Sequence, residues 1–437
     1  MKSAAIPVFS QEISFMHKSL MCAILLAAIL FFSACNNKNN KKDFVKDEKL
    51  QKELQEKFIL VEDGGTIELP AGNYLFAKAL SLEGKKNITI RGAGTGKTIF
   101  SFLGQTEGAE GILITNCDGI TVQDFTIQDA KGDNLKLKGC KNVAIRNMNS
   151  TWTTGADTAN GNYGYYPVEC INVLLEKCEV SYCADAGVYI GQSTNVIVRD
   201  CYAHHNVAGI EIENCINSDI YHNKAENNSG GILVFDLPKL FQPNGRNARV
   251  YENLITGNNF DNFGKPGSIV ATIPPGSGMI IMATDSVDIF NNNITDNKTV
   301  GCAIVSYFTT GKPVNDSTYG PYCHSVYLHD NLFSRKKLLI PALNTDFGKL
   351  AMAACKGPID IVYDGNFEKE YQNANGLPEG KKICVRNNGE VRFVNMNLWK
   401  AAKLTDVLNT YDKDMAKFDC SYTGINGNNT PIEKPNP

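Results

Sequence analysis

Five short segments between residues 117 and 220 repeat one pattern, in which a small side chain is followed by a turn and a run rich in Ile and Val. The small side chains stand 23, 30, 23 and 22 residues apart, at Cys117, Cys140, Cys170, Ser193 and Cys215. Self-similarity at a fixed period of this size is typical of a repeat architecture. At about 3.3 Å per extended residue, one such repeat is long enough for one coil of a β-solenoid. The sequence therefore predicts an all-β parallel β-helix in which equivalent residues of successive coils stack on one another.

The composition agrees with a folded solenoid. The chain has 437 residues, of which 43% are hydrophobic and 20% are charged, so disorder is expected only near the ends. Asn and Gly are frequent in the repeats, as expected where tight turns alternate with short strands. The net charge of -3 argues against a nucleic-acid-binding protein, which would carry a basic surface.

The amino end has the pattern of a secretory signal. A short apolar run from Leu20 to Phe32 follows Lys18, and it is too short for a comfortable membrane span. The last four residues of the segment 1–35 are Phe-Ser-Ala-Cys, which resembles a bacterial lipobox, so we predict a lipoprotein signal peptide with lipidation at Cys35. An ordinary signal peptide with a chance cysteine is the alternative. Asn36 after the cysteine, and the lack of an acidic tract, favour an outer-membrane lipoprotein that faces the periplasm.

The rest of the chain divides into three parts. Residues 36–46 are polar and are predicted to form a tether. Residues 47–335 are predicted to form the β-helix, whose first segment has helical spacing and should cap the open end of the solenoid. Beyond residue 335 the repeat weakens, so residues 336–437 are expected to hold terminal coils, a C-terminal cap with a helix over 399–415, and a loose tail.

Alternation along the last strand of each coil separates inward from outward side chains. The inward positions are apolar, at Leu135/Leu137, Val188/Ile190, Ile210/Ile212, Ile232/Val234 and Met279/Ile281. The outward positions are mixed, at Lys136/Lys138, Tyr189/Gly191, Glu211/Glu213, Leu233/Phe235 and Ile280/Met282. A further column runs through Phe125, Met148, Cys178, Cys201, Asn223, Asn253, Asn292 and Asn331. Asparagines at one place per coil predict a hydrogen-bonded ladder.

The cysteines raise the question of pairing. Of 14 cysteines, 12 follow Cys35, and an oxidising compartment favours disulfides. Stacked cysteines have parallel side chains, however, and this arrangement does not favour the dihedral angle that a disulfide requires. We therefore predict reduced, packed thiols in two columns, which are Cys117/Cys140/Cys170 and Cys178/Cys201. Three cysteines outside the columns are better placed to pair, namely Cys355, Cys384 and Cys420.

Common cofactor motifs are missing from the sequence. The segment 91–98 resembles a P-loop, but Arg91 stands where glycine is required and no helix follows, so a turn is predicted. His204 and His205 are the only close histidine pair, and neighbours on a strand should point to opposite faces, which favours a structural role. There is no Cys-x-x-Cys motif. The sequence thus predicts no metal site and carries no nucleotide or haem signature.

The outward stripe holds the best candidate chemistry. Tyr166, Tyr189 and Glu211 should stack on three consecutive coils, with Glu213 beside them. A neighbouring column holds Glu169, Gln192 and Asp236. Two carboxylates one or two coils apart suit the acid and base of glycosidic chemistry, which lie about 5 to 9.5 Å apart, and the repulsion between them would raise one pKa. The alternative is an ordinary solvated polar face.

Insertions interrupt the coils at four places, at residues 151–166, 236–248, 260–278 and 309–322. Insertions in repeat proteins tend to collect on one binding face. The first two lie on either side of the outward stripe, and the second contains Arg246. We expect these two loops to flank a groove.

Residues 60–400 resemble the right-handed parallel β-helix proteins of the pectin-lyase-like superfamily. The resemblance is carried by residues 185–193, 206–214 and 230–238, with an entry coil at 65–74. More narrowly, the chain is similar to an uncharacterised family of exported and lipoprotein β-helix proteins, for which the resemblance implies no established activity. Genes for c-type cytochrome-like exported proteins often lie near members of that family. The Asp-Pro-His-Asp element of alginate epimerases, the signatures of polygalacturonases and the calcium-binding cluster of pectate lyases are absent.

These observations predict an exported, lipid-anchored β-helix protein that binds or processes a polysaccharide in a loop-flanked groove. If it is an enzyme, the resemblance implies a lyase, hydrolase or epimerase. The candidate catalytic residues are Glu211, Glu213, Glu169 and Asp236. The candidate substrate-binding residues are Tyr166, Tyr189, Gln192 and Arg246. The alternative is a non-catalytic envelope scaffold that binds a protein partner such as a c-type cytochrome-like protein.

Overall fold

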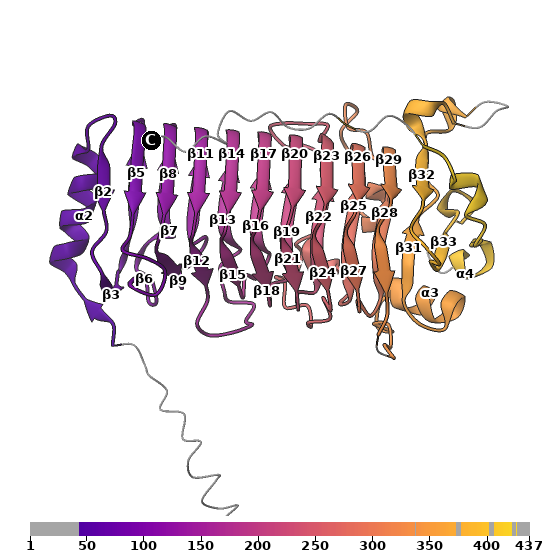
Figure 1. Cartoon of the computed structure of the whole chain (residues 1–437), viewed down its shortest axis with the longest axis horizontal. Helices are drawn as coiled ribbons and strands as arrows, with labels where there is room; N and C mark the ends of the chain where they lie inside the picture. The colour runs from indigo at the N-terminus through magenta and orange to yellow at the C-terminus, as the bar shows by residue number, and fades with distance from the viewer. Residues whose placement is uncertain (1–42, 337, 373–376, 402–405, 422–424, 426–437) are drawn as a thin grey trace, which may run out of the picture. The chain divides into compact units, whose positions relative to one another are not determined.

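The computed structural model describes residues 43–336, 338–372, 377–401, 406–421 and 425. From residue 44 onward this part of the chain forms a rod of stacked coils, with a helix over one end and short helices at the other (Figure 1). Three parallel sheets of 11 strands run along the rod, and each coil contributes one strand to each sheet in turn. The predicted parallel β-helix is confirmed.

The strands of each sheet follow one another coil by coil. Sheet A contains β1 (Val45–Lys46), β3 (Gly72–Leu75), β6 (Thr98–Ser101), β9 (Thr126–Gln128), β12 (Asn149–Thr151), β15 (Glu179–Ser181), β18 (Tyr202–His204), β21 (Lys224–Glu226), β24 (Leu254–Thr256), β27 (Asn293–Thr295) and β30 (Leu332–Ser334). Sheet B contains β2 (Thr66–Glu68), β5 (Lys86–Arg91), β8 (Asp118–Gln123), β11 (Lys141–Arg146), β14 (Ile171–Glu176), β17 (Thr194–Arg199), β20 (Ile216–Tyr221), β23 (Arg246–Tyr251), β26 (Asp285–Phe290), β29 (His324–His329) and β32 (Ile383–Arg386). Sheet C contains β4 (Lys78–Glu83), β7 (Glu107–Thr115), β10 (Leu135–Lys138), β13 (Tyr163–Val168), β16 (Ala186–Gly191), β19 (Ala208–Glu213), β22 (Gly230–Phe235), β25 (Ser277–Met282), β28 (Val300–Val305), β31 (Ile359–Tyr363) and β33 (Phe393–Asn395).

The helices lie at the ends of the rod and in the insertions. The α-helices are α2 (Glu48–Leu60), α3 (Asp346–Cys355) and α4 (Val407–Thr410). The 3-10 helices are η1 (Val270–Thr272), η2 (Tyr307–Thr310), η3 (Lys369–Tyr371), η4 (Glu379–Lys381), η5 (Leu398–Lys400) and η7 (Ala416–Phe418).

The first helix covers the N-terminal end of the bore, as predicted. The Asp47 carboxylate accepts the Leu50 backbone N–H at 2.8 Å, which satisfies one of the free donors at the start of α2. Leu54 and Phe58 are fully buried and belong to the cluster of side chains that fills the bore. The helix therefore shields the apolar end of the first coil from water.

The predicted helix over 399–415 is wrong in length. Among the described residues it is reduced to η5 and the four residues of α4. After Thr410 the backbone leaves the helical path because Asp412 forms an antiparallel bridge with Asn395 at the end of sheet C. The 10-residue helix α3 was not predicted, although Thr345 caps it by accepting the Gly348 backbone N–H at 3.0 Å.

Side chains that point inward fill the bore, as the alternation predicts. The ten inward positions named above all belong to the bore cluster. Four of their outward neighbours in sheet C belong to a second apolar cluster outside the bore, namely Tyr189, Leu233, Phe235 and Met282. The structure confirms the predicted register, in which Tyr189 pairs with Glu211 and Glu211 pairs with Leu233.

The predicted asparagine ladder is present at the corner between sheets B and A. Each amide nitrogen donates to the amide oxygen one coil further on, at 2.9 to 3.1 Å. The ladder contains Asn223, Asn253, Asn292, Asn331 and also Asn388. The sequence analysis missed a second ladder, which contains Asn206, Asn228, Asn258 and Asn297. All nine side chains are buried, and the ladders satisfy polar backbone groups at the corners of the rod.

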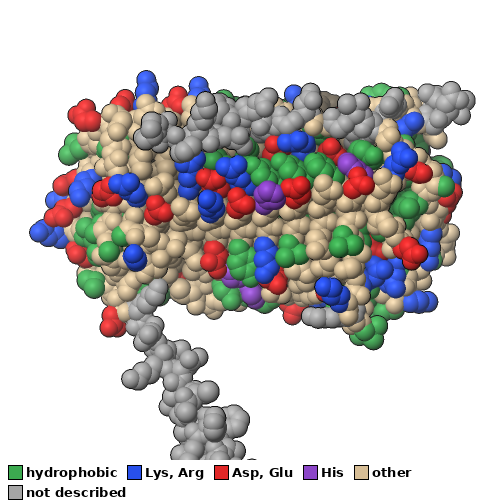
Figure 2. Space-filling model, in the orientation of Figure 1, with side chains coloured by type: hydrophobic (Ala, Val, Ile, Leu, Met, Phe, Trp, Pro, Cys, Tyr) green, Lys and Arg blue, Asp and Glu red, His purple; other side chains and the backbone are tan. Residues whose placement is uncertain are grey.

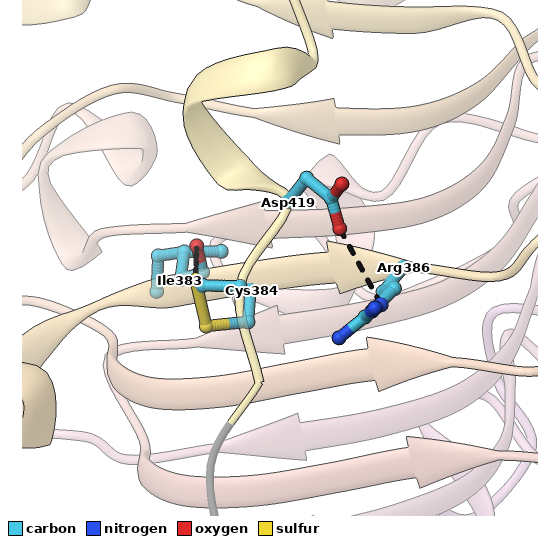
Figure 3. The surroundings of a disulfide bond; sticks show 5 residues. Ile383, Cys384, Arg386 and Asp419 are labelled. Carbon is cyan, nitrogen blue, oxygen red and sulfur yellow. Dashed lines mark hydrogen bonds and ion pairs between the residues drawn. A yellow bond between two sulfur atoms is a disulfide. The ribbon is translucent and has the colours of Figure 1, made fainter.

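Cysteines follow the predicted division. The stacked cysteines of both columns are buried and carry free thiols. Cys384 in β32 is paired with Cys420, and the Asp419 carboxylate lies 3.5 Å from the Arg386 guanidinium beside them (Figure 3). Cys355 does not pair and is a free thiol.

The amino end is described only from residue 43. The predicted signal peptide, the lipidation site Cys35 and most of the tether lie outside the described residues. Val45 and Lys46, at the end of the predicted tether, form β1 and pair with β3. Within the described ranges, no helix combines the length and the apolar character that a membrane crossing requires. Acidic and basic side chains are intermixed along the face that Figure 2 draws.

Candidate functional site

Inserted segments cover the outward face of sheet C. Two of the predicted loops are shorter than expected, because residues 163–166 belong to β13 and residues 246–248 belong to β23. Val270 and Ile273, from the insertion before β25, pack in the outer apolar cluster with Leu233 and Phe235. Tyr307 and Tyr319, from the insertion after β28, belong to the same cluster. The outward stripe is therefore mostly roofed over.

The loop after β22 closes over a corner of the rod instead of standing beside an open groove. The Gln242 side chain donates to the backbone oxygens of Ser193 and Asn214 at 3.0 and 2.8 Å. The Asn214 side chain in turn donates to the Leu237 backbone oxygen at 2.9 Å. These bonds fix residues 236–245 against the turn between sheets C and B, which corrects the predicted groove.

Glu211 and Glu213 point outward from β19, as predicted, but they are buried. Their side chains are 2% and 7% exposed, so the alternative of a solvated polar face is wrong for both. The Tyr189 hydroxyl donates to Glu213 Oε1 at 2.6 Å. Within the described part of the chain, Glu211 Oε2 has no hydrogen-bond partner. A buried oxygen without a donor is costly if the carboxylate is ionised, so this environment favours the protonated acid.

Three tyrosine rings lie against the two glutamates. The ring centroids of Tyr163, Tyr166 and Tyr189 are 4.4 to 4.9 Å apart. Tyr166 and Tyr189 meet edge to face at 84°, not in a parallel stack. Tyr189 is only 4% exposed, whereas Tyr163 and Tyr166 are half-buried and keep surface that a ligand can reach. The ammonium of Lys136 lies 4.6 Å from the centre of the Tyr166 ring.

A third carboxyl group, Asp185, completes the cluster. It lies just before β16, and its pKa is raised to about 7 by burial and by the charge of Glu213, while Lys265 and a hydrogen bond from Tyr163 oppose the shift. Burial raises the pKa of Glu213 to about 7, and the hydrogen bond from Tyr189 opposes that shift. The pKa of Glu211 is raised by burial, by Glu213 and by Asp185. We call these three carboxyls and the three tyrosines the carboxylate site.

Lys265 links two insertions beside the carboxylate site. Its ammonium donates to the Asn162 side-chain oxygen at 2.7 Å, which joins the segment before η1 to the segment before β13. Burial raises the pKa of both Asp185 and Asp133, and the charge of Lys265 opposes this rise. Lys265 thus holds a loop over the site and also moderates the acidity of its outermost carboxyl group.

The other predicted site residues lie at the edge of this cluster or elsewhere. Asp236 is buried, and burial raises its pKa to about 7, but one carboxylate oxygen accepts the Gly245 backbone N–H at 2.7 Å. Glu169 lies in the turn after β13, 3.3 Å from the Lys138 ammonium. Gln192 lies in the next turn and accepts the Phe241 backbone N–H at 3.2 Å. Arg246 is exposed at the start of β23 in sheet B, on another face of the rod.

Sequence reasoning missed Asp185 and Tyr163, which lie next to the predicted stripe. Asp185 immediately precedes the strand that carries Tyr189, and Tyr163 begins the strand that carries Tyr166. Tyr163 was assigned to the insertion 151–166, and Asp185 was given no role as a site residue. The only signal in the sequence was that each residue lies shortly before an outward tyrosine, Tyr163 before Tyr166 and Asp185 before Tyr189.

The two adjacent histidines point to the same side, contrary to the prediction. His204 and His205 are joined through their Nδ1 atoms at 2.8 Å. His205 has left-handed backbone geometry, with φ of 56°, at the turn after β18, and this turns its side chain back beside His204. Throughout the described ranges, no three His, Cys, Asp or Glu side chains come together in a way that could hold a metal ion.

Comparison with known proteins identifies the handedness of the fold. A family model described as a right handed beta helix region matches residues 110–241 and 158–318. The chain is therefore a right-handed parallel β-helix, as the resemblance implied.

Two curated relatives are phage proteins. The preneck appendage protein of Bacillus phage PZA is 23% identical over 290 residues, which cover 57% of this chain and 33% of that protein. The pre-neck appendage protein of Bacillus phage phi29 is 23% identical over 187 residues, which cover 35% of this chain and 22% of that protein. The chain thus spans about a third and about a fifth of the two relatives.

Solved structures with a similar fold include polysaccharide-modifying enzymes. The A-module of a mannuronan C-5 epimerase from Azotobacter vinelandii has a TM-score of 0.43 and 17% identity, with 75% of this chain and 87% of that chain covered. A pectate lyase has a TM-score of 0.44 and 15% identity, with 64% of this chain and 69% of that chain covered. These are likenesses of fold alone.

Proposed function

We propose that this right-handed parallel β-helix binds a polysaccharide at the carboxylate site and processes it by acid–base chemistry. The observation that carries the proposal is the pair of carboxyls, Glu213 and Asp185, whose pKa values are both raised to about 7. At neutral pH such groups exist in both the protonated and the ionised form. One can then give a proton to a glycosidic oxygen while the other accepts a proton.

The residues have distinct roles in this proposal. Glu213 is the acid or base, because it keeps 7% of its side chain exposed and is oriented by the Tyr189 hydroxyl. Asp185 is its partner in place of Glu169 or Asp236, because burial and the charge of Glu213 raise the pKa of Asp185 and because Asp185 is half-buried at the edge of the site. Tyr166 offers the ring surface on which a sugar can stack. Glu211 stays protonated beneath them.

The test is product analysis on a panel of uronate and neutral glycans. The variants Glu213→Gln and Glu211→Gln keep the shape of the side chain, and Glu252→Gln is the matched control on the exposed surface, where Glu252 pairs with His222 at 2.7 Å. Loss of general acid–base catalysis is expected to lower the rate by about 10²-fold or more in Glu213→Gln. If both site variants retain every detected activity, the assignment of the carboxylate site fails.

A non-catalytic scaffold is the second candidate function. The observation that favours it is the burial of Glu211 and Glu213 beneath the insertions, which limits access to the carboxyls. In this function the rod holds a protein partner in the cell envelope, such as a c-type cytochrome-like protein. A glycan array without any binding, together with recovery of one such partner from envelope extracts, would favour the scaffold.

Export and anchoring belong to the same proposal. The apolar run 20–32 and Cys35 support a lipoprotein that is anchored in the outer membrane and faces the periplasm. Cells grown with labelled palmitate are expected to label the wild-type chain and not the Cys35→Ser variant. Equal labelling of the wild-type chain and the variant would contradict lipid anchoring through Cys35.

A further inference from the structure

A cavity of about 370 Å³ lies on the outward face of sheet C, further along the rod than the carboxylate site. Its floor continues the two columns that contain Glu211 and Glu213, through Phe235, Ile280, Met282, Ala303 and Val305. Its walls come from the segment around η1, from η2 and from the start of α3. Pockets of about 300 to 1,000 Å³ are typical of small-molecule sites. We propose that this cavity binds an uncharged, apolar small molecule.

The floor and one wall of the cavity are apolar. Phe235, Met282, Ala303 and Val305 are 2 to 3% exposed and belong to the outer apolar cluster. On the wall, Ile273 is 5% exposed and belongs to the same cluster. An apolar ligand that displaces water from these surfaces is stabilised in proportion to the area that it covers.

The hydroxyl groups in the walls are already occupied as donors. Each of the five donates to a backbone oxygen three residues earlier in the chain, at 2.6 to 2.8 Å. The five are Thr272, Ser277, Thr309, Thr310 and Thr345. The one other uncharged polar side chain among the described lining residues is Asn344, which is exposed, so a sugar or a bound water finds few free donors in these walls. The cavity therefore differs in chemistry from the carboxylate site.

The charge around the cavity disfavours an anionic ligand. Among the described residues that line it, Asp346 carries the only formal charge. Its side chain is 48% exposed, and its carboxylate lies 3.1 Å from the Lys349 ammonium, so it stands at the rim and is already paired. None of the described lining residues is a cation that could hold a carboxylate or a phosphate. An uncharged ligand is the one that matches this lining.

Fluorescence titration with N-phenyl-1-naphthylamine, an uncharged aromatic probe, tests the proposal on the full chain. Wild type is expected to bind the probe saturably, and 1-decanol is expected to displace it. Ile280→Trp places a large side chain on the floor and should weaken binding at least tenfold. Leu332→Trp, at a 59% exposed strand position in sheet A, is the matched control and should bind as wild type does.

A second variant keeps the test decisive if Ile280→Trp misfolds. Ala303→Leu also fills part of the floor, but with a smaller increase in volume than Ile280→Trp. It should weaken probe binding and leave the far-ultraviolet circular dichroism spectrum unchanged. The variant Glu213→Gln should retain probe binding, so that failure of this site and failure of the carboxylate site can be told apart. Unsaturable binding, equal binding by wild type and the filled variants, or displacement by decanoate as strong as by 1-decanol would each overturn the proposal.

Discussion

At the scale of single residues, buried polar side chains hold the coils in register. Asn253 shows this most clearly, because its side-chain nitrogen donates to Asn292 at 2.9 Å and to the Ile220 backbone oxygen at 2.9 Å. Its side-chain oxygen accepts the backbone and side-chain N–H groups of Asn223 at 3.0 and 3.1 Å. Removing one member therefore leaves donors and acceptors of two neighbouring coils unpaired.

Asn253→Ala is expected to lower the free energy of unfolding by about 2 to 4 kcal/mol, because each unsatisfied buried group costs about 1 to 3 kcal/mol. Urea denaturation followed by circular dichroism measures this change. Asn149→Ala is the control, since Asn149 is half-buried and donates to Glu179 at 3.3 Å near the surface. Equal losses in the two variants would show that the ladder has no special role.

The thiols provide a chemical test at the same scale. Ten cysteines of the described chain are free, and nine of them are buried. A hydrogen bond with Cys117 lowers the pKa of Cys140, but a hydrogen bond with Cys170 and burial together outweigh it and raise this pKa to about 12. Burial raises the pKa of Cys215 to about 12.

Alkylation in denaturant followed by peptide mapping is expected to label all ten free thiols without reductant. Cys384 and Cys420 should be labelled only after reduction, because they form a disulfide. A disulfide between two stacked cysteines, such as Cys178 and Cys201, would contradict the packing described here.

At the scale of elements, the insertions determine what the outward face of sheet C can bind. Lys265 connects two of them through its bond to Asn162 and stands beside Asp185. This single contact links the position of a loop to the charge of the carboxylate site.

Lys265→Met is expected to increase hydrogen exchange in residues 260–269, because the loop loses its bond to Asn162. The pKa of Asp185 should rise further, since the opposing charge is gone. Lys52→Met is the control, because the Lys52 ammonium pairs with Glu56 within α2, at the N-terminal end of the rod. Unchanged exchange in Lys265→Met would show that other contacts hold the loop.

The sequence predicted the coils well because their information is local and repeated. Alternation places Val188 inward and Tyr189 outward, and the period fixes which residues stack, so Tyr189 and Glu211 were paired correctly. The asparagine ladder was visible for the same reason. His205 departed from the alternation, because its left-handed backbone at the turn after β18 turns its side chain beside His204.

The site was predicted less completely because long-range packing decides it. No local pattern shows that the insertion holding Val270 and Ile273 folds back over Leu233 and Phe235. The same packing buries Glu211 and Glu213 and makes Asp185 part of the cluster. The short α4 has the same kind of cause, since the bridge from Asp412 to Asn395 ends it.

At the scale of the whole molecule, the carboxylate site links stability to pH. Glu213 has its pKa raised from 4.5 to about 7 in the folded state, and Asp185 from 3.8 to about 7. Between these values the folded chain binds more protons than the unfolded chain, so the free energy of unfolding falls as pH rises. Shifts of this size correspond to about 3 to 4 kcal/mol for each group, and the interaction between the two carboxyls makes their joint effect smaller than the sum.

The free energy of unfolding at pH 5 and at pH 8, measured for wild type and for Glu213→Gln, tests the central claim most directly. This claim is that buried carboxyls on the outer face of sheet C hold protons near neutral pH. The free energy of unfolding of wild type is expected to fall by several kcal/mol from pH 5 to pH 8, which is on the order of the effect of one or two shifted carboxyls. The fall in Glu213→Gln should be clearly smaller. The control Glu56→Gln, at an exposed position of α2 without a histidine partner, should follow wild type. Identical pH profiles for wild type and Glu213→Gln would contradict the claim.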